Sequence, residues 1–452
     1  MLSEHQLQAL AQRVLGLSQA DETEVLLLGQ VSRLTRFANN TIHQNVAESN
    51  VQVRVRAIVG QQVGVATTDD VTDAGLAGVA ERAVALARLQ TADPFFTGLP
   101  EPDHALSGAL IDLGYAEATA RCAPEVRARA AGVICDAAER AGLVGSGAFS
   151  TVEEAAALGN SLGLWRYHVG TTAKLNTVVM GATGSGWASA ASSDVADIHP
   201  AELAHEAVDI ATRAQNPTDL PPGEYPVVLG SDAVADMLGF FGYVSFNGLA
   251  VHEGRSFVAS RMGQQVMAPT VSIWDDGRDP TGLPLPFDFE GVAKQRVSLV
   301  ENGVVKAAVW DRRSAAKAGG GRVSTGHALP APNNYGALPA HLFMKPGTAS
   351  REELLAGIER GVWVTRFWYT RVVHPLEVVM TGMTRDGTFL IENGKVTRPV
   401  RNLRFTHSYL AAMADVEAIS AETKLIESGM FGAVRAPTIR VRRFTFTGAT
   451  QE

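Results

Sequence analysis

The sequence predicts an α+β fold, with two α/β domains whose mixed and largely antiparallel sheets carry packed helices. Its 452 residues are enough for two or three domains. Segments in which apolar and polar residues alternate, as they do in half-buried strands, recur along the chain between segments with helical spacing. One segment, residues 216–226, holds four prolines and one glycine, which neither a helix nor a central strand tolerates.

We therefore divide the chain at this segment. The predicted parts are an N-terminal α/β domain (1–215), a Pro-rich linker (216–226) and a C-terminal β-rich α+β domain (227–452). The first domain begins with an amphipathic helix over residues 4–17. Residues 51–56 have the sequence VQVRVR, so the valines share one strand face and Gln52, Arg54 and Arg56 share the other. This pattern predicts a sheet with one face in water. Further helices are predicted over 72–89, 116–141 and 200–214, and further strands over 145–153, 161–170 and 174–181.

The second domain is predicted to begin with a strand at 226–229 and a helix that starts near Ser231, a residue type favoured at helix N-termini. Short strands follow to the end of the chain. Two dipeptides, Asn302-Gly303 and Asn393-Gly394, predict tight hairpins, because both residues of such a turn need positive φ.

Composition excludes several classes of protein. With 39 Lys and Arg against 47 Asp and Glu, the net charge of −8 argues against a nucleic-acid-binding protein. Two cysteines cannot form a disulfide scaffold or a four-cysteine zinc site. The first residues lack the apolar stretch of a signal peptide, and no run is long and apolar enough to cross a membrane. We therefore expect a cytoplasmic protein without a membrane segment.

Local motifs give little indication of chemistry. His205-Glu206 and His252-Glu253 lack the second histidine that a helical zinc-peptidase motif needs. The GNSLG match around Ser161 lacks the preceding strand and following helix of a nucleophile elbow, so a turn is favoured. The segment GATGSG at 181–186 lacks the Lys-Ser/Thr pair of a phosphate loop.

Two other segments are candidates for a binding site. In PFDFEG, alternation predicts that Asp288 and Glu290 share one face of a strand, where they either line a cleft or face solvent. Carboxylates are also possible ligands of a hard metal ion. The glycines Gly319, Gly320 and Gly321 predict a flexible loop rather than a nucleotide cradle.

Taken together, the motifs resemble those of the TldD/PmbA family, described as modulators of DNA gyrase and as related to metallopeptidases. The resemblance runs nearly from end to end and rests on the order of motifs that are individually weak. They are TRFANNTIHQN at 35–45, NSLGL at 160–164, RSFVASRMGQQV at 255–266, PFDFEGV at 286–292, VENGVVKAAVWDRRSAAKAG at 300–319, STGHA at 324–328 and FLIENGKVTRPV at 389–400.

This resemblance implies a two-subunit peptidase. TldD-like chains carry His-Glu-x-x-x-His and a later cysteine, which together hold zinc, and the glutamate is the base. PmbA-like chains, also named TldE, lack this set and pair with a TldD-like subunit, and the pair cleaves unfolded peptides inside an enclosed cavity. In the present chain, gapless counting from Ser256-Phe257 places the motif on Leu238, Gly239 and Tyr243, and the cysteine position near Met430. Leucine and glycine cannot bind zinc, and no carboxylate remains there to act as base.

The resemblance therefore favours a non-catalytic PmbA/TldE-like subunit with no metal or other cofactor of its own, whose TldD-like partner carries zinc. The expected partners are that TldD-like chain or a second copy of this chain, together with an unfolded peptide, but neither nucleic acid nor membrane. The peptide would add as a strand and contact Asp288, Glu290 and the glycines at 319–321. Two alternatives stay open: an independent metallopeptidase that uses His252 and Glu253 with distant ligands, and a binding or regulatory protein without a peptidase partner.

Overall fold

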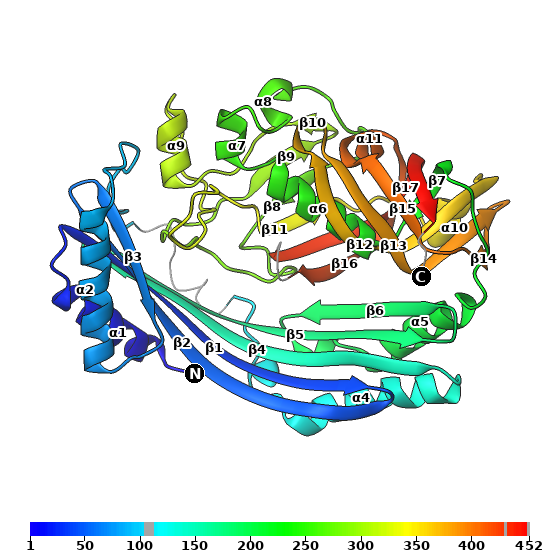
Figure 1. The fold of residues 1–452 in the computed structure, drawn as a ribbon, viewed down its shortest axis with the longest axis horizontal. Coiled ribbons are helices and arrows are strands. Elements are labelled where there is room, and N and C mark those ends of the chain that lie inside the picture. Colours follow the sequence, from blue (N-terminus) through cyan, green and yellow to red (C-terminus); the bar gives the residue numbers. More distant parts are fainter. Residues whose placement is uncertain (104–112, 429–431, 450–452) are drawn as a thin grey trace.

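The computed structural model describes residues 1–103, 113–428 and 432–449. It has two sheets: a six-stranded antiparallel sheet with the order β3-β2-β1-β4-β5-β6, and a mixed eleven-stranded sheet. Figure 1 shows the long, curved first sheet lying beneath the second part of the chain. The predicted α+β fold with largely antiparallel sheets is confirmed.

The first sheet is built from long strands with helices on one face. Its strands are β1 (Glu22–Ala38), β2 (Thr41–Val59), β3 (Gln62–Thr68), β4 (Val144–Asn160), β5 (Trp165–Met180) and β6 (Ser185–Ser192). The accompanying helices are α1 (Glu4–Leu17), α2 (Asp73–Leu89), α3 (Glu117–Ala120), α4 (Pro124–Arg140), η2 (Val195–Asp197) and α5 (Pro200–Arg213). Helices α4 and α5 cover the face of the sheet that is turned away from the second domain (Figure 1).

Side chains alternate along the strands between the two faces of this sheet. Val53, Val55, Leu175 and Val179 are fully buried under the helices. The residues between them, such as Arg56, point to the opposite face, which the second domain covers rather than solvent. Arg56 is only 8% exposed. The prediction of a face in water is therefore wrong for this part of β2.

Strand boundaries near residue 160 differ from those predicted. β4 runs without interruption from Val144 to Asn160, and β5 begins only at Trp165. The run Ala155–Leu158 has a helix-like composition, but it pairs with β1 on one side and with β5 on the other. Pairing and burial between two strands outweigh the high helix propensity of alanine, because intrinsic propensity is small compared with tertiary contacts. The GNSLG segment is the turn between these strands, as predicted.

The second sheet belongs to the C-terminal half. Its strands are β7 (Gly223–Leu229), β8 (Ile273–Asp275), β9 (Val297–Glu301), β10 (Val304–Val305), β11 (His341–Met344), β12 (Arg360–His374), β13 (Val379–Glu392), β14 (Lys395–Pro399), β15 (Leu403–Ser408), β16 (Val416–Ser428) and β17 (Gly432–Ala449). Its helices are α6 (Ser231–Val244), α7 (Gly248–His252), α8 (Val258–Arg261), α9 (Arg312–Ala318), α10 (Arg351–Leu355), η3 (Pro375–Glu377) and α11 (Tyr409–Ala414). β7 pairs with both β12 and β17, which closes a ring of five strands through β13 and β15.

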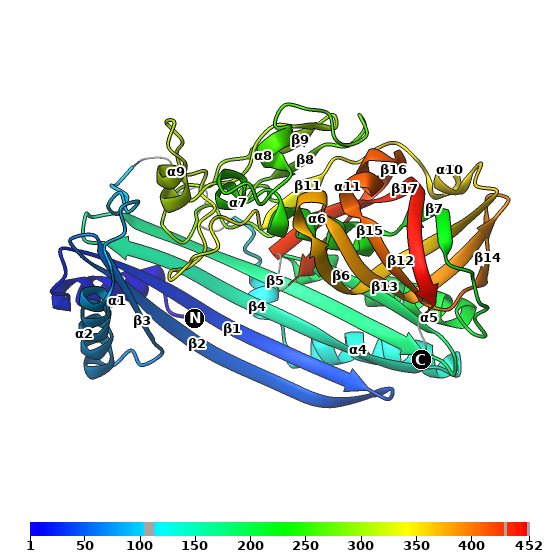
Figure 2. The same cartoon turned by 45° about the horizontal axis from the view of Figure 1, so that its top comes forward.

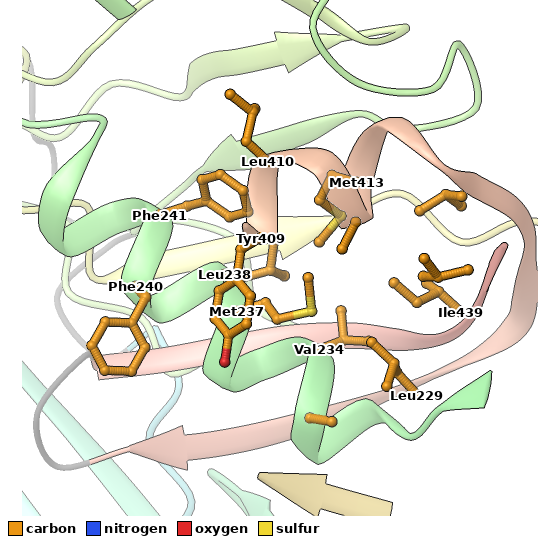
Figure 3. Packing of buried hydrophobic residues seen from close by; sticks show 14 of the residues in the cluster. Leu229, Val234, Met237, Leu238, Phe240, Phe241, Tyr409, Leu410, Met413 and Ile439 are labelled. Carbon is orange, nitrogen blue, oxygen red and sulfur yellow. The ribbon is translucent and has the colours of Figure 1, made fainter. Parts of the chain in front are cut away.

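The core of the second domain forms around α6. Figure 3 shows Leu238, Phe241 and Met237 of this helix among side chains from β7, α11 and β17.

Both predicted hairpins are present, with positive φ at Asn302, Gly303, Asn393 and Gly394. Strand β7 begins at Gly223, inside the segment predicted to be a linker. Among the described residues, no helix combines the length and apolar character needed to cross a membrane.

Candidate functional site

A cavity of about 720 Å³ lies between the two domains. Its first wall is the inner face of β1, β4 and β5, which contributes both apolar and polar side chains. Its second wall consists of loops before β9 and β11 and of the ends of β16 and β17. In Figure 2, β4 and β5 run beneath this part of the second domain. A cavity of this size, with a mixed lining and several convergent polar groups, is typical of a ligand-binding site.

The segment PFDFEG is a turn that docks the second domain onto the first sheet. A bridge between Phe287 and Ala293 closes it, so Asp288 and Glu290 do not share a strand face, and the prediction of a strand is wrong. Phe289 packs against an apolar cluster made by Leu26, Leu158 and Leu164. The carbonyl oxygen of Gly291 accepts a hydrogen bond from Arg166 Nε at 3.0 Å. Local alternation could not reveal this turn, because its contacts with the first domain lie more than 100 residues away in the chain.

Glu290 completes a buried ion cluster across the domain boundary. Arg56 Nη2 lies 2.5 Å from Glu24 Oε2, and Arg56 Nη1 lies 3.3 Å from Glu290 Oε1. Burial raises the pKa of Glu24, and the charge of Arg56 opposes this. Burial alone would lower the pKa of Arg56, but the two carboxylates outweigh it and raise that pKa. Glu290 and Arg56 also border a second cavity, of about 600 Å³.

Asp288 holds the turn in shape. Its Oδ1 accepts hydrogen bonds from the backbone N–H groups of Glu290 and Val292, and its Oδ2 accepts one from Ala328. The residue is 1% exposed. Burial, together with the nearby Glu290, raises the pKa of Asp288 to about 7. With both oxygens engaged by the backbone, Asp288 positions the cavity wall.

A second buried group joins Asp275 to His327 and His341, two histidines that the sequence analysis did not select. Asp275 Oδ1 lies 2.8 Å from His327 Nε2, and Asp275 Oδ2 accepts a hydrogen bond of 2.7 Å from the backbone N–H of His341. Burial raises the pKa of Asp275, but the adjacent His327 holds it well below the usual range. Lys294 lies in the same wall of the cavity. The sequence signals for this group were weak, since its members come from three separate segments.

The positions that the resemblance aligns with the zinc motif lie on α6 but do not converge. Leu238 is fully buried in the domain core (Figure 3). Gly239 is buried as well, whereas Tyr243 is 38% exposed and stacks on Tyr335 with ring centroids 5.0 Å apart. The side chains of Leu238 and Tyr243 therefore face different surroundings.

The remaining predicted residues lie apart from the cavity. Gly319, Gly320 and Gly321 follow α9 with φ values of 63°, 66° and 74° and are exposed. They form a surface loop outside the lining of both cavities. In this chain the left-handed backbone conformation accounts for a run of glycines, because other residues adopt it rarely.

The histidine–glutamate pairs are not part of a ligand set. Glu253 forms ion pairs with Arg255 and Lys317 on the surface. Within residues 1–103, 113–428 and 432–449, no three His, Cys, Asp or Glu side chains are grouped as metal ligands. Met430, the nearest residue to the expected cysteine position, lies outside the described residues.

Comparison with known proteins shows which families and proteins this chain resembles. Residues 222–448 match the PmbA/TldA metallopeptidase C-terminal domain, and residues 23–87 match the PmbA/TldA metallopeptidase domain 1. The chain is 26% identical to the metalloprotease TldD homolog of Buchnera aphidicola over 259 residues, which is 54% of the chain and 52% of that protein. It thus spans about half the length of this relative. It is 25% identical to the metalloprotease PmbA homolog of Haemophilus influenzae over 364 residues, 77% of the chain and 76% of that protein.

The fold is also similar to a solved structure. TldE from Thermococcus kodakarensis superposes with a TM-score of 0.88 at 21% sequence identity, and the match covers 98% of this chain and 100% of that one. At this identity the likeness establishes the fold alone.

Proposed function

We propose that this chain, which belongs to the PmbA/TldD metallopeptidase family, is a PmbA/TldE-type subunit of a two-chain cytoplasmic peptidase. The substrates of this peptidase are unfolded peptides. Its TldD-like partner carries the zinc and the catalytic base. The present chain contributes no ligand to that zinc. It forms part of the chamber and binds the peptide substrate.

The observation that carries this proposal is the composition and packing of α6. The positions aligned with His-Glu-x-x-x-His hold Leu238, Gly239 and Tyr243, none of which can supply a zinc ligand and base in the manner of the family motif. Leu238 is part of the core, so a side chain at this position is directed into the domain. Helix α6 therefore serves as a structural element.

The cavity between the domains supports the peptide-binding part of the proposal. It presents a sheet face with both apolar and polar side chains opposite loops of the second domain. A bound peptide contacts the wall that the 288–292 turn holds in place, with Glu290 closer to open space than Asp288. Strand addition requires a free strand edge, and β3, an edge strand of the first sheet, borders the neighbouring cavity of about 600 Å³.

The test combines the purified chain with a TldD-like chain that carries the complete zinc motif. Hydrolysis of an unfolded peptide and zinc content are measured for each chain alone and for the mixture. We expect zinc and activity in the mixture, and neither in the present chain alone. The control is the same mixture with a variant of the TldD-like chain, in which alanine replaces the first histidine of the zinc motif. This mixture is expected to be inactive.

Two outcomes would contradict the proposal. Stoichiometric zinc and hydrolysis by this chain alone would make it an independent metallopeptidase. Peptide binding without any association with a TldD-like chain would favour a binding or regulatory protein.

A further inference from the structure

Lys294 is a buried lysine in the wall of the 720 Å³ cavity. The residue is 4% exposed. Its aliphatic stem crosses Gly277 so closely that a Cβ on that glycine would overlap the lysine Cδ. Gly277 has no positive φ, so close approach, rather than backbone conformation, accounts for glycine here. The local structure is thus shaped to hold a lysine side chain.

Among the described residues the ammonium group of Lys294 forms neither a hydrogen bond nor an ion pair, and it is not one of the fully buried polar atoms, which places it at the surface of the cavity. Two carboxylates, those of Asp275 and Asp288, are near enough to affect its pKa, but neither forms an ion pair with it. The oxygens of both carboxylates already accept hydrogen bonds from other donors. Burial lowers the pKa of Lys294, and these carboxylates oppose the shift. An ammonium held at the cavity surface without an ion-pair partner is available to a ligand that supplies an anionic acceptor.

His341 adds a second unpartnered group to the same wall. The residue is 9% exposed and borders the cavity. Its Nδ1 is buried and has no hydrogen-bonding partner among the described residues, whereas Nε2 is not one of the fully buried atoms and is the ring nitrogen that a ligand in the cavity can reach. Its backbone N–H is held by Asp275, and β11 fixes its position. Burial, reinforced by the charge of Lys294, lowers the pKa of His341 to about 3. The ring is therefore neutral at physiological pH and carries one N–H.

The two groups together indicate an anionic ligand. Both can donate hydrogen bonds, and the ammonium of Lys294 repels a cation at this point. The nearby carboxylates do not compete for a ligand's donors, because the backbone and His327 occupy them. Around the pair, Leu28, Phe289 and Leu338 offer apolar surface for the rest of a ligand.

We propose that Lys294 and His341 bind a carboxylate of the peptide held in this cavity. Lys294 Nζ forms a charge-assisted hydrogen bond with the carboxylate, and the imidazole N–H of His341 donates a second bond to it. This inference rests on the proposed function, because it requires that a peptide binds in the cavity. It adds that one carboxylate of this peptide, at its end or on a side chain, is held at a fixed position. The carboxylate comes from the C-terminus of the peptide or from an acidic side chain.

The test measures binding of three fluorescent, unstructured peptides to the full chain by anisotropy. The first has a free C-terminal carboxylate and no acidic side chain, the second is its C-terminal amide, and the third is the amide with one internal glutamate. We expect wild-type protein to bind the free acid at least about tenfold more tightly than the amide, since charge-assisted hydrogen bonds are among the stronger polar contacts. Tight binding of the third peptide would assign the carboxylate to a side chain.

Two variants sharpen this measurement. Lys294→Met, which keeps the length of the stem, is expected to reduce the preference for a carboxylate to less than about twofold. Lys174→Met is the matched control, because Lys174 lines the same cavity but its ammonium already pairs with Glu427. This control is expected to keep the preference. Correct folding of both is checked by circular dichroism, and the wild-type comparison of acid with amide decides the question even where a variant does not fold.

The proposal is overturned where wild-type protein binds all three peptides equally, or where Lys294→Met weakens all three to the same degree. Such a result leaves the proposed function intact if the mixture with a TldD-like chain still hydrolyses peptide. Failure of all three peptides to bind, alone and in the mixture, would reject the peptide-binding role and this inference together.

Discussion

The two faces of the six-stranded sheet have opposite construction, although the same strands supply both. Along β5, Leu175 and Val179 are fully buried beneath α4 and α5. Neighbouring residues on the same strand, His168, Thr172 and Lys174, border the cavity on the other face. The helix-covered face is closed by apolar packing, whereas the inner face meets the second domain through ion pairs, hydrogen bonds and an apolar cluster around Phe289.

This difference shows how one sheet serves two purposes. Apolar packing on the outer face holds the first domain together without directional contacts. The inner face requires charged groups to be paired, because charges removed from water are costly unless they find partners. Where pairing is complete, as at Arg56, the face joins the domains. Where pairing is incomplete, as at Lys294 in the opposite wall of the cavity, the space between the domains is suited to bind a ligand.

The largest effect is expected on breaking the paired part of the inner face. Arg56→Met leaves the carboxylates of Glu24 and Glu290 buried without their cation, and we expect it to lower the free energy of unfolding by about 3–5 kcal/mol. Denaturant unfolding at pH 7 measures this. Arg13→Met is the control, because its ion pair with Asp73 is exposed, and its effect should stay below about 1 kcal/mol. Equal effects of the two variants would contradict a stabilising role for the buried cluster.

A matched pair on β5 compares the faces directly. Leu175→Ala opens a cavity under the helices and is expected to cost about 2–5 kcal/mol of unfolding free energy. Thr172→Ala, on the cavity side of the same strand, should change it by only about 0.5 kcal/mol. Thermal and denaturant unfolding of both variants provide the measurement. A cost for Thr172→Ala as large as that for Leu175→Ala would mean that the inner face is packed as tightly as the outer one.

The smallest expected effect concerns pH and the turn that joins the domains. The pKa of Asp288 is about 7 in the folded protein and near 3.8 when exposed, so the folded state binds more protons between these values. This group's contribution to stability is therefore complete below about pH 4 and falls as pH rises towards 7. Wild-type protein should lose about 1–3 kcal/mol relative to Asp288→Asn between pH 5 and pH 8.

The comparison with Asp288→Asn isolates this group from others that titrate in the same range. His341, with a pKa of about 3 in the folded protein, changes stability in the opposite direction, because the unfolded state takes up its proton first as pH falls. Glu290 and Lys294 remain beside Asp288 in both proteins. Parallel stability curves for wild type and variant across pH 5 to 8 would show that Asp288 does not titrate there.

Much of the fold could be predicted from local patterns. The valines of 51–56 fall on one buried face, and Asn302-Gly303 and Asn393-Gly394 form the expected turns, because side-chain alternation and positive φ are local properties. The run Ala155–Leu158 was misleading, since its strand state depends on partners in β1 and β5. Family resemblance correctly identified the family, whereas single motifs did not.

The candidate site was much less accessible to sequence analysis. Asp288 and Glu290 were selected, but as residues of a strand, and their contacts with Ala328 and Arg56 come from distant segments. Lys294, His327 and His341 were not selected at all. An isolated lysine or histidine in a loop has no distinguishing local pattern, and only its burial beside a cavity makes it notable.

By itself, the sequence determined which residues alternate along each strand, where tight turns occur and which residues stand at the positions that the resemblance aligns with the zinc motif. Only the tertiary structure decided that the polar face of the first sheet is covered by a second domain. The physical reason is that alternation distinguishes the two faces of a strand but does not specify what covers each face. That depends on contacts between residues far apart in the chain, such as Arg56 with Glu290 and Arg166 with Gly291.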